Sequence, residues 1–310
     1  MWSSWRGWGA SLVAALALTA GFTSSVNAAT TNNDDVGPLI VGGRPASQTY
    51  SFMASLQGGQ GHFCGGSLIT PTWVVTAKHC VQGQSPGSFR VRVGTTTWNA
   101  GGELAQTAQI VPGQGDIALV RLSAPVSQTP IPIAADAGPA GTGTRLIGWG
   151  QTCPTRGCGG APVQLQEIDV QVQASGCTDN FNPQTELCLG GQPSAGACYG
   201  DSGGPSVRQA NGRWELTGAT SRAGRGQPTC GQAPAIYMNV PAHKQWIDQV
   251  TGGDPGPGCG STAAWSAEEL YPPGTEVAHN GRKWRSAWWN RAQEPGAGPW
   301  YWQDIGACTA

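Results

Sequence analysis

The stretch Ile168-Asp-Val-Gln-Val172 alternates apolar and polar residues with a period of two. This period is typical of a β-strand that buries one face and exposes the other. The stretch Phe89-Arg-Val-Arg-Val93 has the same alternation. Between about residues 40 and 252, more short apolar runs are separated by turns rich in Gly, Pro and Asn; they include Ser67–Ile69, Trp73–Ala77, Ile117–Leu122, Thr144–Ile147 and Leu216–Thr220. The pattern predicts an all-β fold of antiparallel strands.

One helix and a separate small unit are expected after these strands. Pro241 suits the first turn of a helix, and Trp246, Ile247 and Val250 are spaced to share one face. Residues 252–258 have the Gly/Pro-rich composition of a linker. Residues 259–310 then form a second unit. So short a unit has little core, and a disulfide between Cys259 and Cys308, near its two ends, would stabilise it.

The overall composition excludes several classes of protein. Charged residues make up 11% of the 310 residues, against roughly 25% in an average soluble domain. The net charge is −1, which argues against binding nucleic acid through a basic face. Gly (48) and Pro (23) are abundant but show no Gly-X-Y period, so the chain is not collagen-like.

The N-terminal segment has the features of a secretory signal peptide. Arg6 precedes an apolar run from Leu12 to Phe22, and Val26-Asn-Ala28 is a small-x-small cleavage pattern. The apolar run is shorter than the about 20 residues that span a bilayer, although a retained membrane anchor is the alternative. Residues 1–28 therefore predict secretion into an oxidising compartment, without a membrane partner. The ten cysteines fit five disulfides, whose pairing the spacing alone does not fix.

The sequence contains a serine, a histidine and an aspartate in short motifs that suit nucleophilic catalysis. Ser202 lies in Gly200-Asp-Ser-Gly-Gly-Pro205, His79 in Val74-Val-Thr-Ala-Lys-His-Cys80, and Asp116 opens an apolar run. A serine hydroxyl needs a base that takes its proton, and the base needs an acceptor that fixes its tautomer. The glycines allow a substrate carbonyl to approach the backbone, where the N–H groups of Gly200 and Ser202 could stabilise an oxyanion.

Four motifs in order resemble the chymotrypsin/trypsin family of serine endopeptidases; they are Ile40-Val-Gly-Gly43, Thr76-Ala-Lys-His-Cys80, Asp116-Ile-Ala-Leu119 and Gly200-Asp-Ser-Gly-Gly-Pro205. The resemblance covers residues 40–251. It implies a double antiparallel β-barrel with a C-terminal helix and an active site between the barrels. It also implies that Ser202 is the nucleophile, His79 the general base and Asp116 the orienting carboxylate, with no cofactor.

The same resemblance implies that residues 29–39 are an activation propeptide. Cutting before Ile40 would free an α-ammonium that pairs with the buried carboxylate of Asp201. The residue before the cut is Leu39, not a basic residue, which argues against a trypsin-like activator. Self-processing and cutting by another protease both stay open.

The resemblance also implies disulfides. Matching positions pair Cys64 with Cys80, Cys177 with Cys188 and Cys198 with Cys230, and the two cysteines left over, Cys153 and Cys158, form the remaining pair. The spacings lack paired C-x-x-C motifs, so we expect no metal site, zinc being the alternative considered.

The specificity pocket implied by the family is uncharged. Gly196, six residues before the serine, takes the floor position where trypsin-like members carry Asp, and Ala235 takes a second pocket position. With Ser221 and Ala223 in the strand that pairs with substrate, the pocket suits apolar side chains and not Lys or Arg. Arg222 and Arg225 either favour acidic residues in the substrate or are solvated charges at the rim.

Alternative assignments for these residues are weaker. Gly200-Asp-Ser-Gly-Gly204 also fits the nucleophile elbow of α/β-hydrolases, but that fold needs alternating strands and helices and the order Ser, acid, His. His62, in a Gly-rich segment, and His243, on the terminal helix, are expected to be structural.

The C-terminal unit resembles the small chitin- or cellulose-binding modules of bacterial secreted hydrolases. The resemblance rests on segments that include Trp265–Tyr271, Asn280–Trp289 and Gly298–Cys308. Asn280-Gly281 predicts a hairpin turn and hence a small β-module. Trp265, Trp284 and Trp302 are expected in its core. Tyr271, Trp288 and Trp289 are expected to form the platform for sugar rings.

The sequence therefore predicts a secreted, monomeric serine endopeptidase that acts on proteins or peptides and is held on chitin or a cellulose-like polysaccharide. Two alternatives are a carbohydrate-binding protein with an inactive catalytic part and a regulatory convertase with one narrow target.

Overall fold

The computed structural model describes residues 40–191, 195–252, 259, 262–279, 282–296, 298 and 300–308. The predicted signal peptide, the propeptide, most of the linker and the Asn280-Gly281 turn lie outside the described residues. Among the described helices, none is long and apolar enough to cross a membrane.

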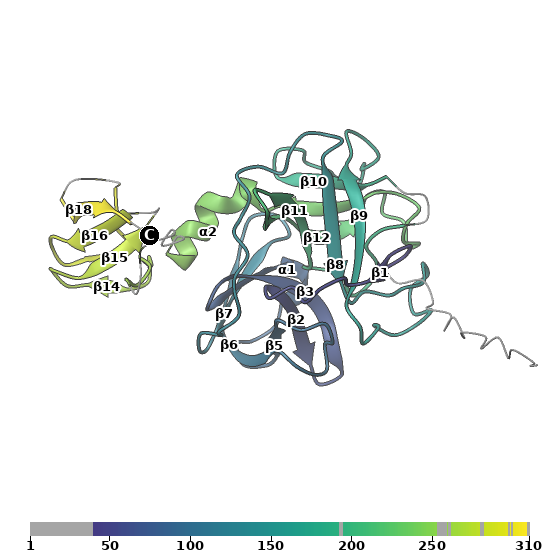
Figure 1. The fold of residues 1–310 in the computed structure, drawn as a ribbon, viewed down its shortest axis with the longest axis horizontal. Coiled ribbons are helices and arrows are strands. Elements are labelled where there is room, and N and C mark those ends of the chain that lie inside the picture. The colour runs from purple at the N-terminus through teal and green to yellow at the C-terminus, as the bar shows by residue number, and fades with distance from the viewer. Residues whose placement is uncertain are drawn as a thin grey trace, which may run out of the picture. The chain divides into compact units, whose positions relative to one another are not determined.

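Six antiparallel strands form a first closed barrel in the order β2-β3-β4-β7-β6-β5 (Figure 1). They are β2 (Met53–Gly58), β3 (Gly61–Thr70), β4 (Trp73–Thr76), β5 (Arg90–Val93), β6 (Glu103–Pro112) and β7 (Ala118–Leu122). In β5, Val91 and Val93 are fully buried while Arg90 is exposed, as the alternation predicted.

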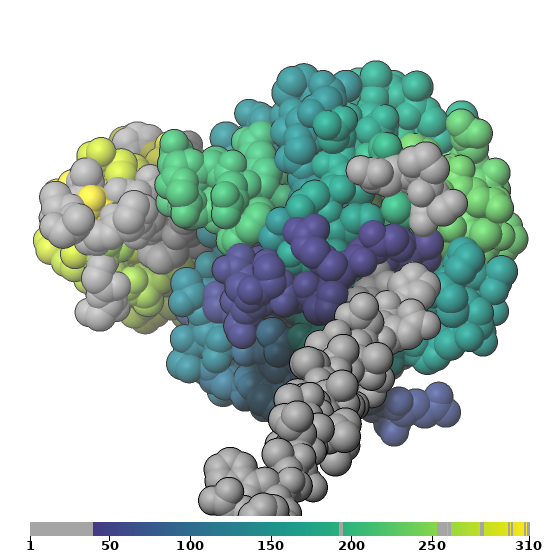
Figure 2. Space-filling model, turned by 45° about the vertical axis from the view of Figure 1, so that its right-hand side comes forward, coloured from purple at the N-terminus to yellow at the C-terminus, as the bar shows by residue number. Residues whose placement is uncertain are grey.

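A second sheet has the order β1-β9-β10-β13-β12-β11-β8, and an additional pairing of β8 with β9 closes it. Its strands are β1 (Arg44–Pro45), β8 (Gly143–Gly148), β9 (Gln166–Val172), β10 (Glu186–Gly190), β11 (Pro205–Ala210), β12 (Arg213–Ala223) and β13 (Ala235–Asn239). The short strand β1 is exposed and, among the described strands, pairs with β9 alone; it belongs to the purple part of the surface in Figure 2. The predicted double barrel is confirmed.

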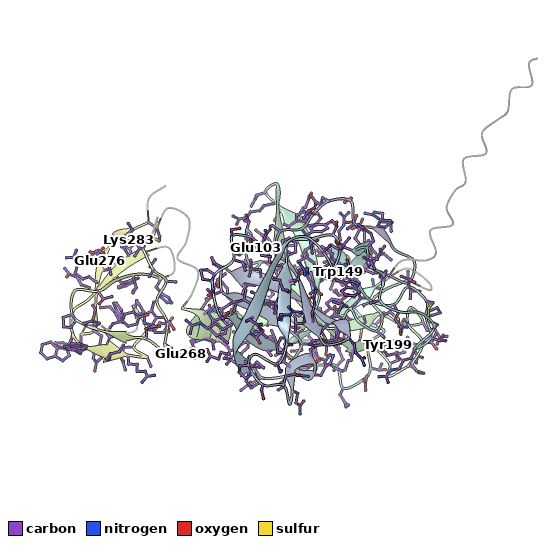
Figure 3. All side chains as sticks on the ribbon, turned by 90° about the horizontal axis from the view of Figure 1, so that it is seen from below. Glu103, Trp149, Tyr199, Glu268, Glu276 and Lys283 are labelled. Carbon is purple, nitrogen blue, oxygen red and sulfur yellow. A yellow bond between two sulfur atoms is a disulfide. The ribbon has the colours of Figure 1, made fainter. Side chains whose placement is uncertain are left out.

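The two barrels meet closely at the segment that carries Ser202. One apolar core contains residues of both, including Leu56 and Leu216, together with the fully buried Trp149 (Figure 3). The backbone N–H of Gly65 in β3 donates to the carbonyl of Ser202 at 2.8 Å. A Cβ on Gly65 would lie only 2.8 Å from the Cα of Gly204, so the contact requires glycine. This close approach holds the serine segment against the first barrel.

Helices are short and few in the described part of the chain. Helix α1 (Lys78–Val81) follows β4 and carries His79. The expected C-terminal helix is confirmed as a 3-10 turn, η1 (Pro241–His243), followed by α2 (Lys244–Thr251). Ile247 is buried, and Trp246 and Val250 pack against the core. Gly252, at a φ of 90°, ends α2.

The C-terminal unit is a small β-structure, as expected. Strand β14 (Leu270–Tyr271) pairs with β17 (Asn290–Arg291). Strands β15 (Glu276–His279), β16 (Arg282–Ser286) and β18 (Trp302–Ala307) form a three-stranded sheet. Trp265 and Trp302 are buried and Trp284 packs against them, which confirms the expected core.

Five disulfides join the cysteines in the expected pairs: Cys64–Cys80, Cys153–Cys158, Cys177–Cys188, Cys198–Cys230 and Cys259–Cys308. Within the described residues, the group close enough to hold a metal ion is Cys64, His79 and Cys80. Because its two sulfurs are bonded to each other, it offers no thiolate ligands.

Candidate active site

The side chains of His79 and Asp116 are joined at one end of the first barrel. Helix α1 carries His79, and Asp116 precedes β7. The Nδ1 of His79 lies 2.7 Å from Asp116 Oδ2, and the backbone N–H of His79 donates to Asp116 Oδ1 at 2.9 Å. The two bonds fix the imidazole with Nδ1 toward the carboxylate, which leaves Nε2 for proton transfer.

The carboxylate of Asp116 also accepts a hydrogen bond from Ser221 Oγ in β12 at 2.7 Å. Burial by itself would raise the pKa of Asp116. The hydrogen bonds from His79 and Ser221 outweigh burial and hold this pKa below its usual value. Asp116 is therefore ionised near neutral pH, as an acceptor behind a general base must be.

Ser202 lies in a tight turn just before β11, where the surrounding glycines are sterically required. Gly203 has a φ of 76°, and a Cβ there would lie 2.1 Å from Thr76 Oγ1. Gly200 has a φ of 100°, which also favours glycine. Ser202 and His79 line the same cavity, but no hydrogen bond joins Ser202 Oγ to His79 Nε2 in the described, uncut chain. Catalytic contacts of this kind often form only with substrate in place.

His62 contacts the nucleophile segment, which the sequence reasoning did not anticipate. Its Nε2 lies 3.0 Å from the carbonyl oxygen of Gly200, and its Nδ1 lies 2.8 Å from Ser55 Oγ. Burial lowers the pKa of His62 to about 4, although the bond to Gly200 acts in the opposite direction. A neutral ring that donates from Nε2 and accepts at Nδ1 satisfies both partners.

Asp201 is a buried carboxylate next to the serine. It is 2% exposed and accepts the backbone N–H groups of Gly150 and Cys198, each at 2.8 Å. Burial raises the pKa of Asp201 to about 6, against the effect of these two bonds. No cation contacts it among the described residues. The side chain of Ile40 is already buried, in a cluster with Leu146 and Tyr237.

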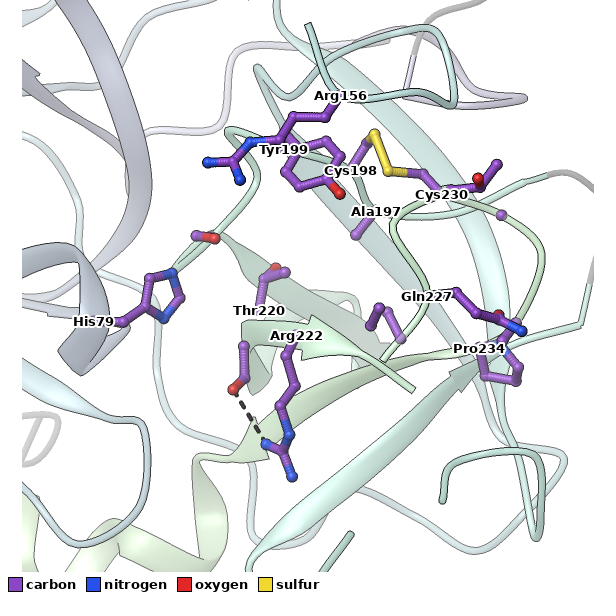
Figure 4. A pocket seen from close by; sticks show the side chains of 17 residues that line it. His79, Arg156, Ala197, Cys198, Tyr199, Thr220, Arg222, Gln227, Cys230 and Pro234 are labelled. Atoms are coloured by element: carbon purple, nitrogen blue, oxygen red, sulfur yellow. Dashed lines mark hydrogen bonds between the residues drawn. A yellow bond between two sulfur atoms is a disulfide. The ribbon is translucent and has the colours of Figure 1, made fainter. Parts of the chain in front are cut away.

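Beside Ser202 the structure has a cavity of about 380 Å³ (Figure 4). Its walls include Ser221, Ala223 and Ala235, as expected, together with Ala197 and the Cys198–Cys230 disulfide. Gly196, the predicted floor, is not among the residues that line the cavity, whereas its neighbour Ala197 is, and the floor position of Gly196 stays a prediction. Gly196 has no side chain to reach the cavity, and its φ of 146° is one that other residues rarely adopt.

Arg222 and Arg156 line this cavity, whereas Arg225 is not among its lining residues. The guanidinium of Arg222 contacts Glu186 at 2.7 Å and the carbonyl of Asp179 at 2.9 Å. Arg225 donates to the carbonyl of Gly176 at 3.1 Å. Arg156, which the sequence reasoning did not single out, lies over the ring of Tyr199 at 5.3 Å and has no carboxylate partner among the described residues (Figure 4). Of the two arginines that line the cavity, Arg156 is thus the one without a carboxylate partner among the described residues.

In the C-terminal unit, the expected aromatic platform is partly wrong. Tyr271 is 6% exposed, packs edge-on against Trp302, and its hydroxyl accepts the N–H of Ser266, so it belongs to the core. Trp288 and Trp289 are exposed, and both lie between β16 and β17. Trp300 is 80% exposed and Tyr301 is also exposed; neither was singled out from the sequence.

These exposed aromatics come from two adjoining segments. The N–H of Ala287 donates to the carbonyl of Tyr301 at 2.9 Å, and Ser286 pairs with Trp302. The segments that carry Trp288 and Trp300 therefore run side by side.

Comparisons with known proteins agree with this geometry. The family model described as "Trypsin" matches residues 40–247. The chain is similar to a trypsin of Sarcophaga bullata, with 33% identity over 72% of this chain and 92% of the relative. It is also similar to a trypsin of Phaedon cochleariae (31% identity, 68% of this chain and 88% of the relative) and to trypsin delta of Drosophila erecta (31%, 67% and 87%). A double barrel with Ser202, His79 and Asp116 at one cavity and these matches lead to one conclusion: the chain belongs to the trypsin family and is a serine endopeptidase.

Proposed function

We propose that this endopeptidase cleaves peptide bonds after apolar residues. The observation that carries the proposal is the chemistry of the cavity beside Ser202. Its described walls include Ala197, Ala223, Ala233, Pro234 and Ala235, and they contain no carboxylate. Burying the ammonium or guanidinium of a substrate Lys or Arg there would leave its charge unpaired, which is costly. An apolar side chain gains free energy from the same burial.

The proposed reaction uses the residues already described. Ser202 Oγ attacks the scissile carbonyl carbon while His79 Nε2 takes the hydroxyl proton. The N–H groups of Gly200 and Ser202 stabilise the oxyanion. His79 then gives the proton to the leaving amine as the C–N bond breaks. A water molecule repeats the sequence on the acyl-enzyme, which releases the acid and regenerates Ser202. Asp116 stays ionised and holds the tautomer of His79.

A charge placed in the cavity tests the specificity. Ala197→Asp puts a carboxylate on the wall, and Ala197→Asn is the control of the same size without charge. In a peptide library, the Asp variant should gain cleavage after Lys and Arg by about tenfold or more relative to the Asn variant. If the unsubstituted enzyme already prefers Lys or Arg, the apolar assignment is wrong. Gly196→Asp is a poorer test, because its backbone conformation would strain any residue with a Cβ.

We also propose activation by cleavage before Ile40. The support is the buried, raised-pKa carboxylate of Asp201, which a new α-ammonium would neutralise. Mass spectrometry of the protein secreted by a strain with Ser202→Ala tests which protease cleaves the Leu39–Ile40 bond. An intact Leu39–Ile40 bond in that variant and a cut bond in the parent indicate self-processing, whereas equal cutting in both indicates another protease.

The C-terminal unit, we propose, holds the enzyme on chitin or a cellulose-like polysaccharide. The support is the exposed group of Trp288, Trp289, Trp300 and Tyr301 on two adjoining segments. Flat aromatic faces suit the C–H faces of sugar rings. Trp300→Ala and Trp288→Ala should each lower retention of the Ser202→Ala protein on chitin beads. Val163→Ala, which removes an exposed apolar side chain of the catalytic part, is the control. Equal retention of all three would exclude this platform, and a parallel column of cellulose distinguishes the two polymers.

Secretion and a monomeric state complete the proposal. Five disulfides support an oxidising compartment. Sedimentation of the secreted Ser202→Ala protein at micromolar concentration should give a single species with the mass of one chain, and a dimer would contradict this part of the proposal.

A further inference from the structure

A chain of hydrogen bonds runs from Glu186 to the catalytic dyad. Glu186 Oε1 accepts from Arg222 Nη1 at 2.7 Å, and Arg222 Nη1 also reaches Ser221 Oγ at 3.4 Å, the dashed line in Figure 4. Ser221 Oγ in turn donates to Asp116 Oδ2 at 2.7 Å. Asp116 is bonded to His79. Arg222 thus lies two hydrogen bonds from the carboxylate that orients the general base.

A β-bulge makes this arrangement possible. Neighbouring residues of a regular strand point to opposite faces. In the pairing of β12 with β13, however, Thr220 is opposite Tyr237 and Arg222 is opposite Ile236, so the register shifts at Ser221. A bulge re-aims side chains, and here it lets the side chains of Ser221 and Arg222 meet.

The guanidinium of Arg222 is held in place from several sides. Its two terminal nitrogens contact both carboxylate oxygens of Glu186, at 2.7 and 3.1 Å. Nε and Nη2 also donate to the carbonyl of Asp179, and Nη2 to that of Asn180. Glu186 is nearly buried and accepts the N–H of Asn182. A clamp of this kind fixes one rotamer, so the contact with Ser221 is a stable feature of the site.

A single substitution among the charged side chains near His79 and Asp116 changes the net charge there. Arg222 and Glu186 form a pair of opposite sign, and Asp179 Oδ2 lies 3.8 Å from Arg222 Nε. Lys78, next to His79, donates to the carbonyl of Gly113 at 2.9 Å. His243 bonds to the backbone of Thr185, which precedes Glu186 in the chain, and burial lowers the pKa of His243. Removing one member of the Arg222–Glu186 pair therefore leaves a net charge close to Asp116 and His79.

We propose that Arg222 is a positioning residue for catalysis, which orients the Ser221 hydroxyl toward Asp116 and, paired with Glu186, keeps the surroundings of the catalytic dyad electrically balanced. Without the donor on its oxygen, the Ser221 hydroxyl is free to rotate away from Asp116, which weakens the bond to that carboxylate.

Substitution of Arg222 and substitution of Glu186 should shift the pH dependence of kcat/KM in opposite directions. Arg222→Gln leaves the negative Glu186, which favours the protonated imidazole, so the acid limb of kcat/KM should move to higher pH. Glu186→Gln leaves the positive Arg222, so the acid limb should move to lower pH. Each shift is expected to be about half a pH unit. The variant with both substitutions should lie between the two, and Arg222→Lys, which keeps the charge, should lie close to the parent.

The rates are measured between pH 5 and 9 on a short neutral peptide amide with one apolar residue, and the active enzyme is counted by titration with a fluorophosphonate. Arg225→Gln, an exposed arginine two residues beyond the strand, is the matched control and should leave the acid limb in place. Arg222→Gln should also lower kcat by about threefold to tenfold. Acid limbs that shift in the same direction in the two single variants, or that do not shift, overturn the proposal, because a purely structural pair would lose activity without opposite shifts.

Discussion

The imidazole of His62 lies 3.0 Å from the carbonyl oxygen of Gly200, so a side chain of β3 in the first barrel supports the turn that carries Ser202 in the second. Its other nitrogen bonds to Ser55, and its ring packs against the buried Trp149. His62 thus links the packing of the two barrels to the geometry of the oxyanion site.

Loss of this link should slow the chemical step. His62→Leu keeps an apolar contact with Trp149 but removes both hydrogen bonds. We expect kcat to fall by about tenfold, with KM changed less than twofold. Removal of an oxyanion-hole donor typically lowers kcat by about 10²- to 10³-fold. The effect here should be smaller, because the N–H of Gly200 is displaced and not removed. Stopped-flow rates on an apolar ester give kcat and KM separately, and thermal unfolding checks that the variant folds. An unchanged kcat would show that Gly200 is held without His62.

The uncut chain should show a pH dependence that originates at Asp201. The pKa of this carboxyl is raised to about 6 by burial, above its value of about 4 in the unfolded chain. A raised pKa contributes stability that is present below pH 4 and is lost as the pH rises through 6. The loss is on the order of 3 kcal/mol.

This contribution is isolated in the uncut Ser202→Ala protein by comparison with the same protein carrying Asp201→Asn. The stability difference between the two, measured by urea unfolding, should change in favour of Asn between pH 4 and 7. A difference that is constant over this range would contradict the burial of an ionisable, unpaired carboxyl.

Glu167 should make the stability depend on pH in the direction opposite to Asp201. Its buried carboxylate is bonded to Tyr50 at 2.6 Å and pairs with Arg44 and Arg145. Burial alone would raise the pKa of Glu167, but the hydrogen bonds from Tyr50 and Ser47 and the charge of Arg145 outweigh burial and lower this pKa. The contribution to stability is therefore present above about pH 4 and is lost as the pH falls through the lowered pKa.

Glu167→Gln removes the charge with little change in size. We expect a loss of about 2 kcal/mol at pH 7, because the charge-assisted hydrogen bonds are lost, and a much smaller loss at pH 3. Guanidinium unfolding at both pH values measures this. A loss of equal size at both would mean that the charge of Glu167 is not what matters.

Tyr271 should matter for the stability of the C-terminal unit and not for polysaccharide binding. Tyr271→Phe removes only the hydroxyl that accepts the N–H of Ser266, at a cost of about 1 kcal/mol. Retention on chitin should stay unchanged, whereas Trp300→Ala reduces it. Weaker retention of the Phe variant, with the unit still folded, would return Tyr271 to the binding platform.

The sequence predicted those features that depend on local pattern or on short motifs. The alternation in Phe89–Val93 and Ile168–Val172 predicted antiparallel strands, and the motifs around His79 and Ser202 led to the double barrel. Contacts between distant segments were not accessible in this way. The bond from His62 to Gly200 and the Arg222–Glu186 clamp join residues far apart in the chain, and the bulge at Ser221 has no sequence signature.

The sequence also did not predict correctly the burial of every aromatic residue in the C-terminal unit. Tyr271 and Trp300 are both aromatic residues in a Trp-rich module, yet one is in the core and the other is 80% exposed. Tyr271 lies in the strand β14, whose two residues are too few to show a period, and Trp300 lies in a turn before β18.

The central claim is that Ser202 is the nucleophile activated by His79 and Asp116. The most direct measurement compares the rate of hydrolysis of an apolar peptide substrate by the protein cut before Ile40 with the rate of the same protein carrying Ser202→Ala. We predict a loss of kcat of at least about 10⁴-fold in the variant, with the fold retained by circular dichroism. Hydrolysis at an unchanged rate would contradict the assignment of Ser202 and with it the catalytic site described above.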